Sequence, residues 1–183
     1  NGKAVSDYFD AALKTVYVRE LIAPAGYVRD PEVYPVAVEA GKVSAAAVAD
    51  DCVKGSIHIN KIDRETTRFL PQGDSVLAGA VYGLYAREDI VHPDGKTGVL
   101  HRKGSLIAQG TIGRDGTLDF TDLYLGKMFV KEITPPEGYI LDSTEYETEL
   151  TYEGQEKPVV TRSLTVQEQV KKRAFQLIKV SED

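Results

Sequence analysis

The sequence predicts an all-β protein built as a β-sandwich, and three observations lead to this fold class. Apolar and polar residues alternate along short segments, about seven of them in roughly 115 residues. Turn sequences such as PQGD, HPDG, RDG and PPEG separate these segments. No long segment has the 3.6-residue period of an amphipathic helix, so two packed sheets are the simplest way to bury the apolar faces.

The first expected strand of this sandwich, 56–62, reads SIHINKI and places Ile57 and Ile59 on one face. Further strands are expected at 79–86, 105–111, 117–121, 127–133, 145–152 and 159–167. The polar, turn-rich stretch 87–104 is expected to be a long excursion between two strands. Binding specificity, if the protein has any, is expected in such a loop.

Composition narrows the classes of function. The 183 residues include 22 Lys+Arg and 28 Asp+Glu, a net charge of −6, and the scattered basic residues argue against nucleic acid as the main partner. No apolar run approaches the ~20 residues that span a membrane, and the first residues lack the features of a signal peptide, so no membrane insertion is expected in this segment. The single cysteine, Cys52, forms no internal disulfide and has no zinc-like spacing to the three histidines, so no metal or other cofactor is expected.

Two pairs of segments repeat along the chain. Residues 16–27 read VYVRELIAPAGY and residues 128–139 read MFVKEITPPEGY, which places Glu20 and Glu132 at an offset of 132 − 20 = 112 residues. GSIHINKID and RAFQLIKVSED form the second pair, in which Lys61 and Lys179 correspond at an offset of 179 − 61 = 118. Repeats of this length are whole domains, since solenoid repeats have only ~20–50 residues.

The frame of these repeats predicts three parts. A module that begins with its lysine-bearing strand and ends before the next one spans 53–170 and is the complete unit. Residues 1–52 match the C-terminal half of an upstream module, and residues 171–183 match the first strand of a downstream module. We therefore expect the chain to be a segment of a longer tandem array.

Strand alternation brings three ionisable side chains to the inner face of the complete module. Lys61 shares the face of Ile57 and Ile59, and Glu132 and Glu168 follow apolar residues inward in the same way. Buried charges are costly unless they are paired, so the pattern indicates an ion-pair cluster or a reaction that removes the charges. The alternative is that each side chain lies at a strand end and reaches the solvent.

These elements together resemble a known family. The strand GSIHINKID, the segment LAGAVYGLYA and the twice-occurring E-x-x-x-P-x-G-Y element are similar to the Cna-B-type, SpaA-like prealbumin-fold modules of Gram-positive surface adhesins and pilins. The resemblance implies a Greek-key β-sandwich of inverse immunoglobulin type in tandem array. It also implies a self-formed isopeptide bond, in which Lys61 would be the nucleophile and Glu132 the proton shuttle.

The sequence departs from this family at the acceptor. Glu168 stands where the family has Asn or Asp, and its extra methylene is expected to shift the carbonyl by more than ~1 Å, enough to disturb an attack geometry. The sequence therefore favours a non-covalent cluster of Lys61, Glu132 and Glu168 over a covalent bond, which stays the alternative.

The N-terminal half-module has an acid and an acceptor without a lysine. Glu20 matches Glu132, and Asp50, a family-type acceptor, matches Glu168. The unassigned lysine is Lys179, in an expected strand at 173–180. This strand is a candidate to complete the N-terminal half, within the chain or between chains, and the alternative is that both ends are frayed.

The expected function is that of a structural stalk or spacer in an adhesin or pilus-like protein, outside the cell and attached to the wall through other segments. Its partners are then neighbouring modules of the same polypeptide. The alternative is an adhesin domain that contacts host glycan or matrix protein through 87–104, which lacks the aromatic residues that would favour it. A third class, an accessory domain of a carbohydrate-active enzyme, requires a catalytic domain elsewhere. We expect no enzyme activity beyond a single self-crosslinking turnover.

Overall fold

The computed structural model describes residues 2–8, 10, 12–39 and 41–179. Every regular secondary-structure element within that part of the chain is a β-strand. The chain divides into two compact units: unit 1 comprises Asn1–Val53 and Tyr152–Pro158, and unit 2 comprises Lys54–Thr151 and Val159–Asp183. No helix among the described residues is long and apolar enough to cross a membrane.

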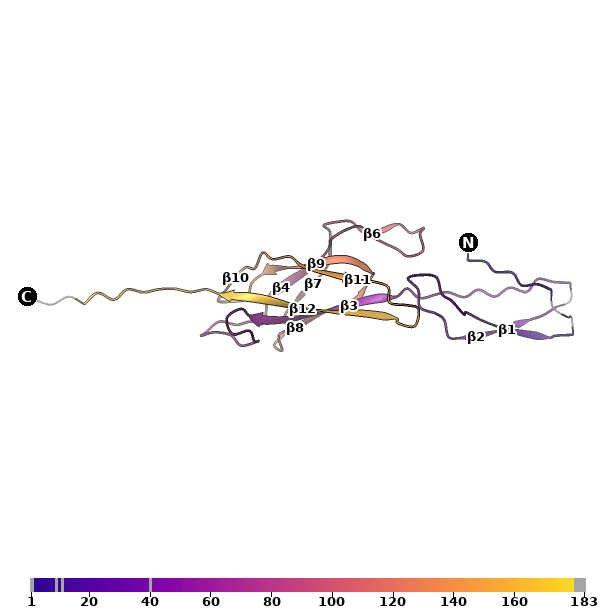
Figure 1. The fold of residues 1–183 in the computed structure, drawn as a ribbon, viewed down its shortest axis with the longest axis horizontal. Helices are drawn as coiled ribbons and strands as arrows, with labels where there is room; N and C mark the ends of the chain where they lie inside the picture. The colour runs from indigo at the N-terminus through magenta and orange to yellow at the C-terminus, as the bar shows by residue number, and fades with distance from the viewer. Residues whose placement is uncertain (1, 9, 11, 40, 180–183) are drawn as a thin grey trace, which may run out of the picture. The chain divides into compact units, whose positions relative to one another are not determined.

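Unit 2 is a sandwich of two four-stranded sheets (Figure 1). One sheet has the order β10-β12-β3-β8 and the other the order β11-β9-β4-β7. The strands of the first sheet are β3 (Lys54–Asp63), β8 (Thr117–Leu123), β10 (Tyr139–Ile140) and β12 (Val159–Val170). Those of the second are β4 (Val81–Ala86), β7 (Leu106–Thr111), β9 (Gly126–Thr134) and β11 (Tyr146–Leu150). The predicted all-β sandwich is confirmed.

The core of unit 2 lies between these sheets, because each long strand turns alternate side chains inward. On β3 every second residue is buried, including Ile57 and Ile59, and the partly exposed residues alternate with them. Leu84 and Val130 cover the same core from the second sheet. The expected alternation along the first strand is thus present in the structure.

The first and last long strands of unit 2 are neighbours. β3 and β12 pair in parallel over ten residues, from Val159↔Lys54 to Glu168↔Asp63, whereas β8 pairs with β3 in antiparallel fashion. Val166 is the partner of Lys61 in this register. The first and last long strands of unit 2 therefore lie side by side in the middle of one sheet.

Three further strands are too short to show a period. β5 (Ile90–Val91) and β6 (Val99–His101) form a small two-stranded sheet inside the expected excursion 87–104. β10 has two residues and directly follows the PPEG turn. Two or three residues carry no readable alternation, which is why the sequence did not indicate these strands.

Among its described residues, unit 1 contains one antiparallel pair, β1 (Thr15–Arg19) and β2 (Val33–Ala37). Residues 42–52 of this unit lack an extended strand. Residues 171–179, at the end of unit 2, also have no regular secondary structure and are all exposed. The expected strand 173–180 is thus not formed over its described part, and residue 180 lies outside the described residues.

Candidate functional site

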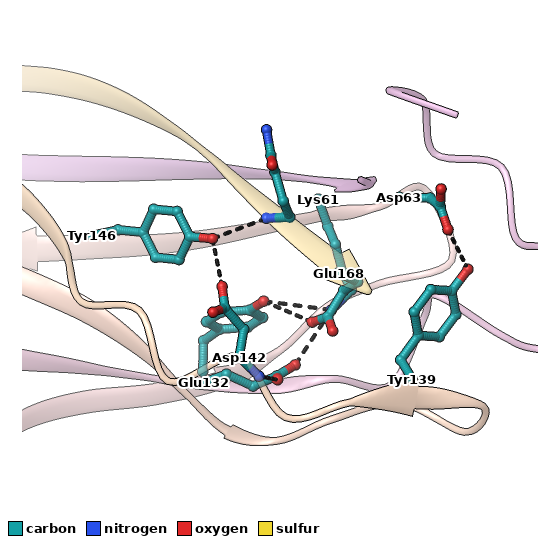
Figure 2. Close-up of polar contacts among 9 residues, drawn as sticks. Lys61, Asp63, Glu132, Tyr139, Asp142, Tyr146 and Glu168 are labelled. Atoms are coloured by element: carbon teal, nitrogen blue, oxygen red, sulfur yellow. Dashed lines mark hydrogen bonds and ion pairs between the residues drawn. The ribbon is translucent and has the colours of Figure 1, made fainter. Parts of the chain in front are cut away.

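The structure brings Lys61, Glu132 and Glu168 together inside unit 2. Lys61 is carried by β3, Glu168 by the adjacent β12, and Glu132 by β9 of the opposite sheet. Their exposed fractions are 1%, 0% and 3%, so the arrangement in which each reaches the solvent does not occur. All three side chains converge on one point between the sheets (Figure 2).

The lysine is in contact with both carboxylates. Lys61 Nζ donates to Glu168 Oε1 in a very close contact and lies 3.5 Å from Glu132 Oε1. The other oxygen of Glu132, Oε2, accepts the backbone N–H of Asp142 at 2.8 Å. Glu132 is therefore fixed at one oxygen and faces the lysine with the other.

Burial shifts the pKa values of two members of this cluster. Desolvation lowers the pKa of Lys61 below that of a free lysine, because a buried ammonium has lost its hydration. Desolvation also raises the pKa of Glu132 to about 8, with Glu168 contributing in the same direction. Both shifts are toward the uncharged forms, in which an amine can attack a carbonyl and an acid can donate a proton.

Tyr82 is a fourth member of the buried cluster. Its ring is fully buried on β4, and its hydroxyl donates to Glu168 Oε1 at 3.0 Å and lies 3.5 Å from Lys61 Nζ. Burial raises the pKa of this hydroxyl, so it acts as a donor. Glu168 Oε2 is buried and has no hydrogen-bond partner among the described residues.

A chain of hydrogen bonds holds the acid and the last strand in place. Tyr146 donates from its hydroxyl to Asp142 Oδ2 at 2.6 Å and accepts the backbone N–H of Gln167 on β12 at 3.1 Å. Asp142 in turn donates its N–H to Glu132. Asp142 and Tyr146 thus lie between Glu132 and the strand that carries Glu168 (Figure 2).

Asp63, two residues after Lys61, is a buried charge that sequence reasoning missed. It is 0% exposed and accepts from the backbone N–H groups of Glu65 and Thr66, from Gln72 and from the Tyr139 hydroxyl. These hydrogen bonds outweigh desolvation and lower its pKa. Its position on the inward face of β3 is the signal that could have identified it.

Unit 1 repeats half of this arrangement. Glu20 Oε2 accepts the backbone N–H of Asp30 at 2.8 Å, as Glu132 accepts that of Asp142, and the Tyr34 hydroxyl donates to Asp30. Asp50, the position matching Glu168, is partly buried. Lys179 is exposed at the end of unit 2.

Comparisons with known proteins bear on the family and the fold of this chain. The family model of the SpaA prealbumin-like fold domain matches residues 55–163, which is 109 of the 183 residues. The Bacillus anthracis TIE protein is similar over 84% of this chain and 24% of its own, with 25% identity and a TM-score of 0.61. The group B streptococcus pilus 2b backbone protein is similar over 81% of this chain and 53% of its own, with 22% identity and a TM-score of 0.46.

This chain thus spans between 24% and 53% of the length of these two solved structures. A search of curated proteins gave no match.

Proposed function

Because this chain belongs to the SpaA family of prealbumin-like fold domains, we propose that it is a structural stalk or spacer segment of a Gram-positive cell-surface protein, an adhesin or a pilus-like fibre. The observation that carries this proposal is the buried cluster of Lys61, Glu132 and Glu168. Side chains that are sealed from solvent cannot act on an external substrate. Their chemistry is then directed at the protein itself and serves its stability.

The proposal includes an isopeptide bond between Lys61 and Glu168. The neutral Nζ attacks Cδ of Glu168, the Nζ–Cδ bond forms, the bond from Cδ to one carboxylate oxygen breaks, and that oxygen leaves as water. Protonated Glu132 donates its proton to the leaving oxygen, then takes the second proton from Nζ and passes it to the same oxygen, so that water leaves and Glu132 ends ionised. The Tyr82 hydroxyl stabilises charge on the oxygen that remains. The reaction occurs once in each molecule.

The contacts of Glu168 support this bond over a permanent ion pair. Oε1 already accepts the Tyr82 hydroxyl, whereas Oε2 has no partner among the described residues. An unpaired buried carboxylate oxygen is costly, and loss of Oε2 as water removes it. The product amide keeps one oxygen, which retains its hydrogen bond to Tyr82.

The proposal extends to the organisation of the chain. We assign residues 53–170 to one complete module, residues 1–52 to the second half of a preceding module, and residues 171–183 to the start of a following one. The support for this frame is that unit 1 repeats the Glu132–Asp142–Tyr146 contacts at Glu20, Asp30 and Tyr34.

Intact-mass measurement of the purified chain tests the bond. We expect a mass about 18 Da below the sequence mass, and full sequence mass in Lys61→Met, which fills the space of the lysine without a nucleophile. Lys131 lies on β9 directly before Glu132 and points outward, so Lys131→Met is the matched control. It should keep the mass deficit of the wild type. A wild-type chain at full sequence mass would overturn the covalent proposal and leave a non-covalent cluster.

A further inference from the structure

The strand that carries the acceptor, β12, has an open edge beside Glu168. One side of β12 pairs with β3 over ten residues, whereas among the described residues β10 pairs with the other side only at Gln169 and Val170. The carbonyl of Glu168 accepts the Arg64 N–H at 2.9 Å on the β3 side, so the preceding N–H, that of Gln167, points to the other edge. A backbone donor at such an edge takes its partner from outside the sheet.

Tyr146 supplies that partner from the opposite sheet. It is partly buried on β11, the end strand of the second sheet, and is paired with Val130 of β9. Its hydroxyl accepts the Gln167 N–H at 3.1 Å and donates to Asp142 Oδ2 at 2.6 Å (Figure 2). This contact therefore joins the two sheets one residue before the acceptor, Glu168.

The protonation states fix the direction of these hydrogen bonds. Burial and the hydrogen bond to Asp142 raise the pKa of Tyr146 to about 12, so its hydroxyl keeps its proton. Desolvation opposes ionisation of Asp142, but hydrogen bonds from Thr144 and Tyr146 outweigh it and lower the pKa of Asp142. A hydroxyl that donates to a carboxylate can accept a backbone N–H with its own lone pairs, so both contacts are made at once.

Asp142 connects this contact to the acid. Its side chain accepts from the hydroxyls of Tyr146 and Thr144, and its backbone N–H donates to Glu132 Oε2 at 2.8 Å. The other oxygen of Glu132, Oε1, thereby faces Lys61 Nζ at 3.5 Å. Movement of Asp142 would release Oε2 and let the carboxyl group of Glu132 rotate away from the lysine.

The same acid, aspartate and tyrosine recur in unit 1 with the same spacings of 10 and 4 residues, as Glu20, Asp30 and Tyr34. There too the aspartate N–H donates to the glutamate, at 2.8 Å, and the tyrosine hydroxyl donates to the aspartate. The three residues between aspartate and tyrosine differ, PEV in one copy and STE in the other. The contacts therefore recur although the sequence between them does not.

We propose that Tyr146 is a positioning residue for the isopeptide reaction, which orients Glu132 toward Lys61 when the strand that carries Glu168 has docked. One hydroxyl holds both Asp142 and the backbone of β12, so the acid is set in place as the last strand arrives. Tyr146 acts through these two contacts and not on the reacting atoms. The inference rests on the isopeptide bond proposed above.

The rate of bond formation tests this role. Chain from a brief cell-free synthesis is unfolded in urea before it has reacted and diluted into buffer. Intact mass then follows the loss of about 18 Da, and circular dichroism follows folding. Tyr146→Phe keeps the ring without the hydroxyl and should slow the loss of water at least about tenfold. Tyr85→Phe, on the outward face of β4, is the matched control and should react at the wild-type rate.

A pH profile separates positioning from a merely structural role. Protonated Glu132 is the acid, so the rate should fall as the pH rises through its pKa of about 8. The Asp142 N–H lowers this pKa, so a loosened contact in Tyr146→Phe should move the fall to higher pH. Tyr85→Phe should leave it in place. The other groups that face Glu132 are the same in both variants: Lys61 from β3, Tyr82 from β4 and Glu168 from β12.

Two substitutions of Asp142 form an independent test. Asparagine keeps an acceptor oxygen for the Tyr146 hydroxyl and alanine does not, while both keep the backbone N–H. Asp142→Ala should therefore react as slowly as Tyr146→Phe, and Asp142→Asn should react faster than Asp142→Ala. The double variant Tyr146→Phe/Asp142→Ala should be no slower than either single variant, because the two side chains act through one contact.

Equal rates for Tyr146→Phe and Tyr85→Phe would overturn the inference and leave the bond standing. A slower Tyr146→Phe whose pH profile does not move would do the same. Equal rates for Asp142→Ala and Asp142→Asn also count against it, and this pair decides the question if Tyr146→Phe does not fold. A wild type that stays at full sequence mass overturns the bond itself and, with it, this role of Tyr146.

Discussion

Glu132→Gln isolates the proton shuttle of the buried cluster. Glutamine keeps the length of the side chain, and its carbonyl oxygen can still accept the Asp142 N–H, but it cannot take a proton from Lys61. We expect the variant to fold with Lys61 and Glu168 in contact and no covalent bond between them. Its intact mass should equal the sequence mass, whereas the wild type should lack about 18 Da.

The loss of stability follows from the loop that the bond closes. Lys61 and Glu168 are 168 − 61 = 107 residues apart, and a cross-link over that distance lowers the entropy of the unfolded chain by an amount worth about 4.8 kcal/mol. For a domain of this size, each kcal/mol changes the melting temperature by about 4 °C. Glu132→Gln should therefore melt about 20 °C below the wild type.

Scanning calorimetry and intact mass, measured on the same samples, check the expected difference in melting temperature and the expected mass deficit. Glu149→Gln is the control, because Glu149 lies on the exposed face of β11 and its replacement makes the same change of mass. It should keep the mass deficit and the wild-type melting temperature. A Glu132→Gln protein that still lacks one water would refute the role of the shuttle, and equal melting temperatures despite different masses would refute the entropy argument.

Three further substitutions test the surroundings of the cluster. Tyr82→Phe removes the donor to Glu168 and should slow bond formation about 10²-fold in a time course of intact mass after cell-free synthesis; a wild-type rate would contradict the donor role. Asp63→Asn should cost about 2–3 kcal/mol in urea unfolding at pH 7. Because the folded pKa of Asp63 is lowered, its stabilisation is complete above pH 3.8 and is lost as the pH falls through the folded value, so wild type and variant should converge in acid; a constant difference would contradict this. Gly138→Ala should cost about 1–3 kcal/mol in urea unfolding, since Gly138 has φ +86° and an added Cβ would lie 2.5 Å from the Ser75 Cβ; an unchanged midpoint would count against it.

Sequence alone predicted the parts of the fold that long strands control. A two-residue period is unambiguous over the ten residues of β3, so one buried residue, Ile57, determines the direction of Lys61. The same reasoning on β9 and β12 directed Glu132 and Glu168 inward. The repeat predicted the module boundaries 53–170, because two copies of E-x-x-x-P-x-G-Y fix a frame that a single copy does not, and that frame stays a prediction.

The alternation of inward and outward residues along a strand does not reveal which atoms a buried polar group contacts. Tyr82 reads as an apolar core residue, and its contact with Glu168 depends on β4 facing β12 across the sandwich. Asp63 could be placed on the inward face, but Gln72, which satisfies it, comes from a loop without a period. Contacts of this kind are set by how the two sheets and their loops pack.

The extra methylene of Glu168 does not keep its carboxylate from the lysine, because Lys61 approaches on a flexible four-carbon stem. The repeat keeps one spacing constant: each acceptor position precedes the next lysine by 11 residues, from Asp50 to Lys61 and from Glu168 to Lys179.

With the proposed bond in place, a pulling force along the chain enters the module at Lys61 and leaves it at Glu168 through one covalent link. Without the bond, the same pull shears the ten parallel residue pairs of β3 and β12 together. The module thus resists extension through its first and last strands in either state, and the bond removes the load from the 106 residues between them.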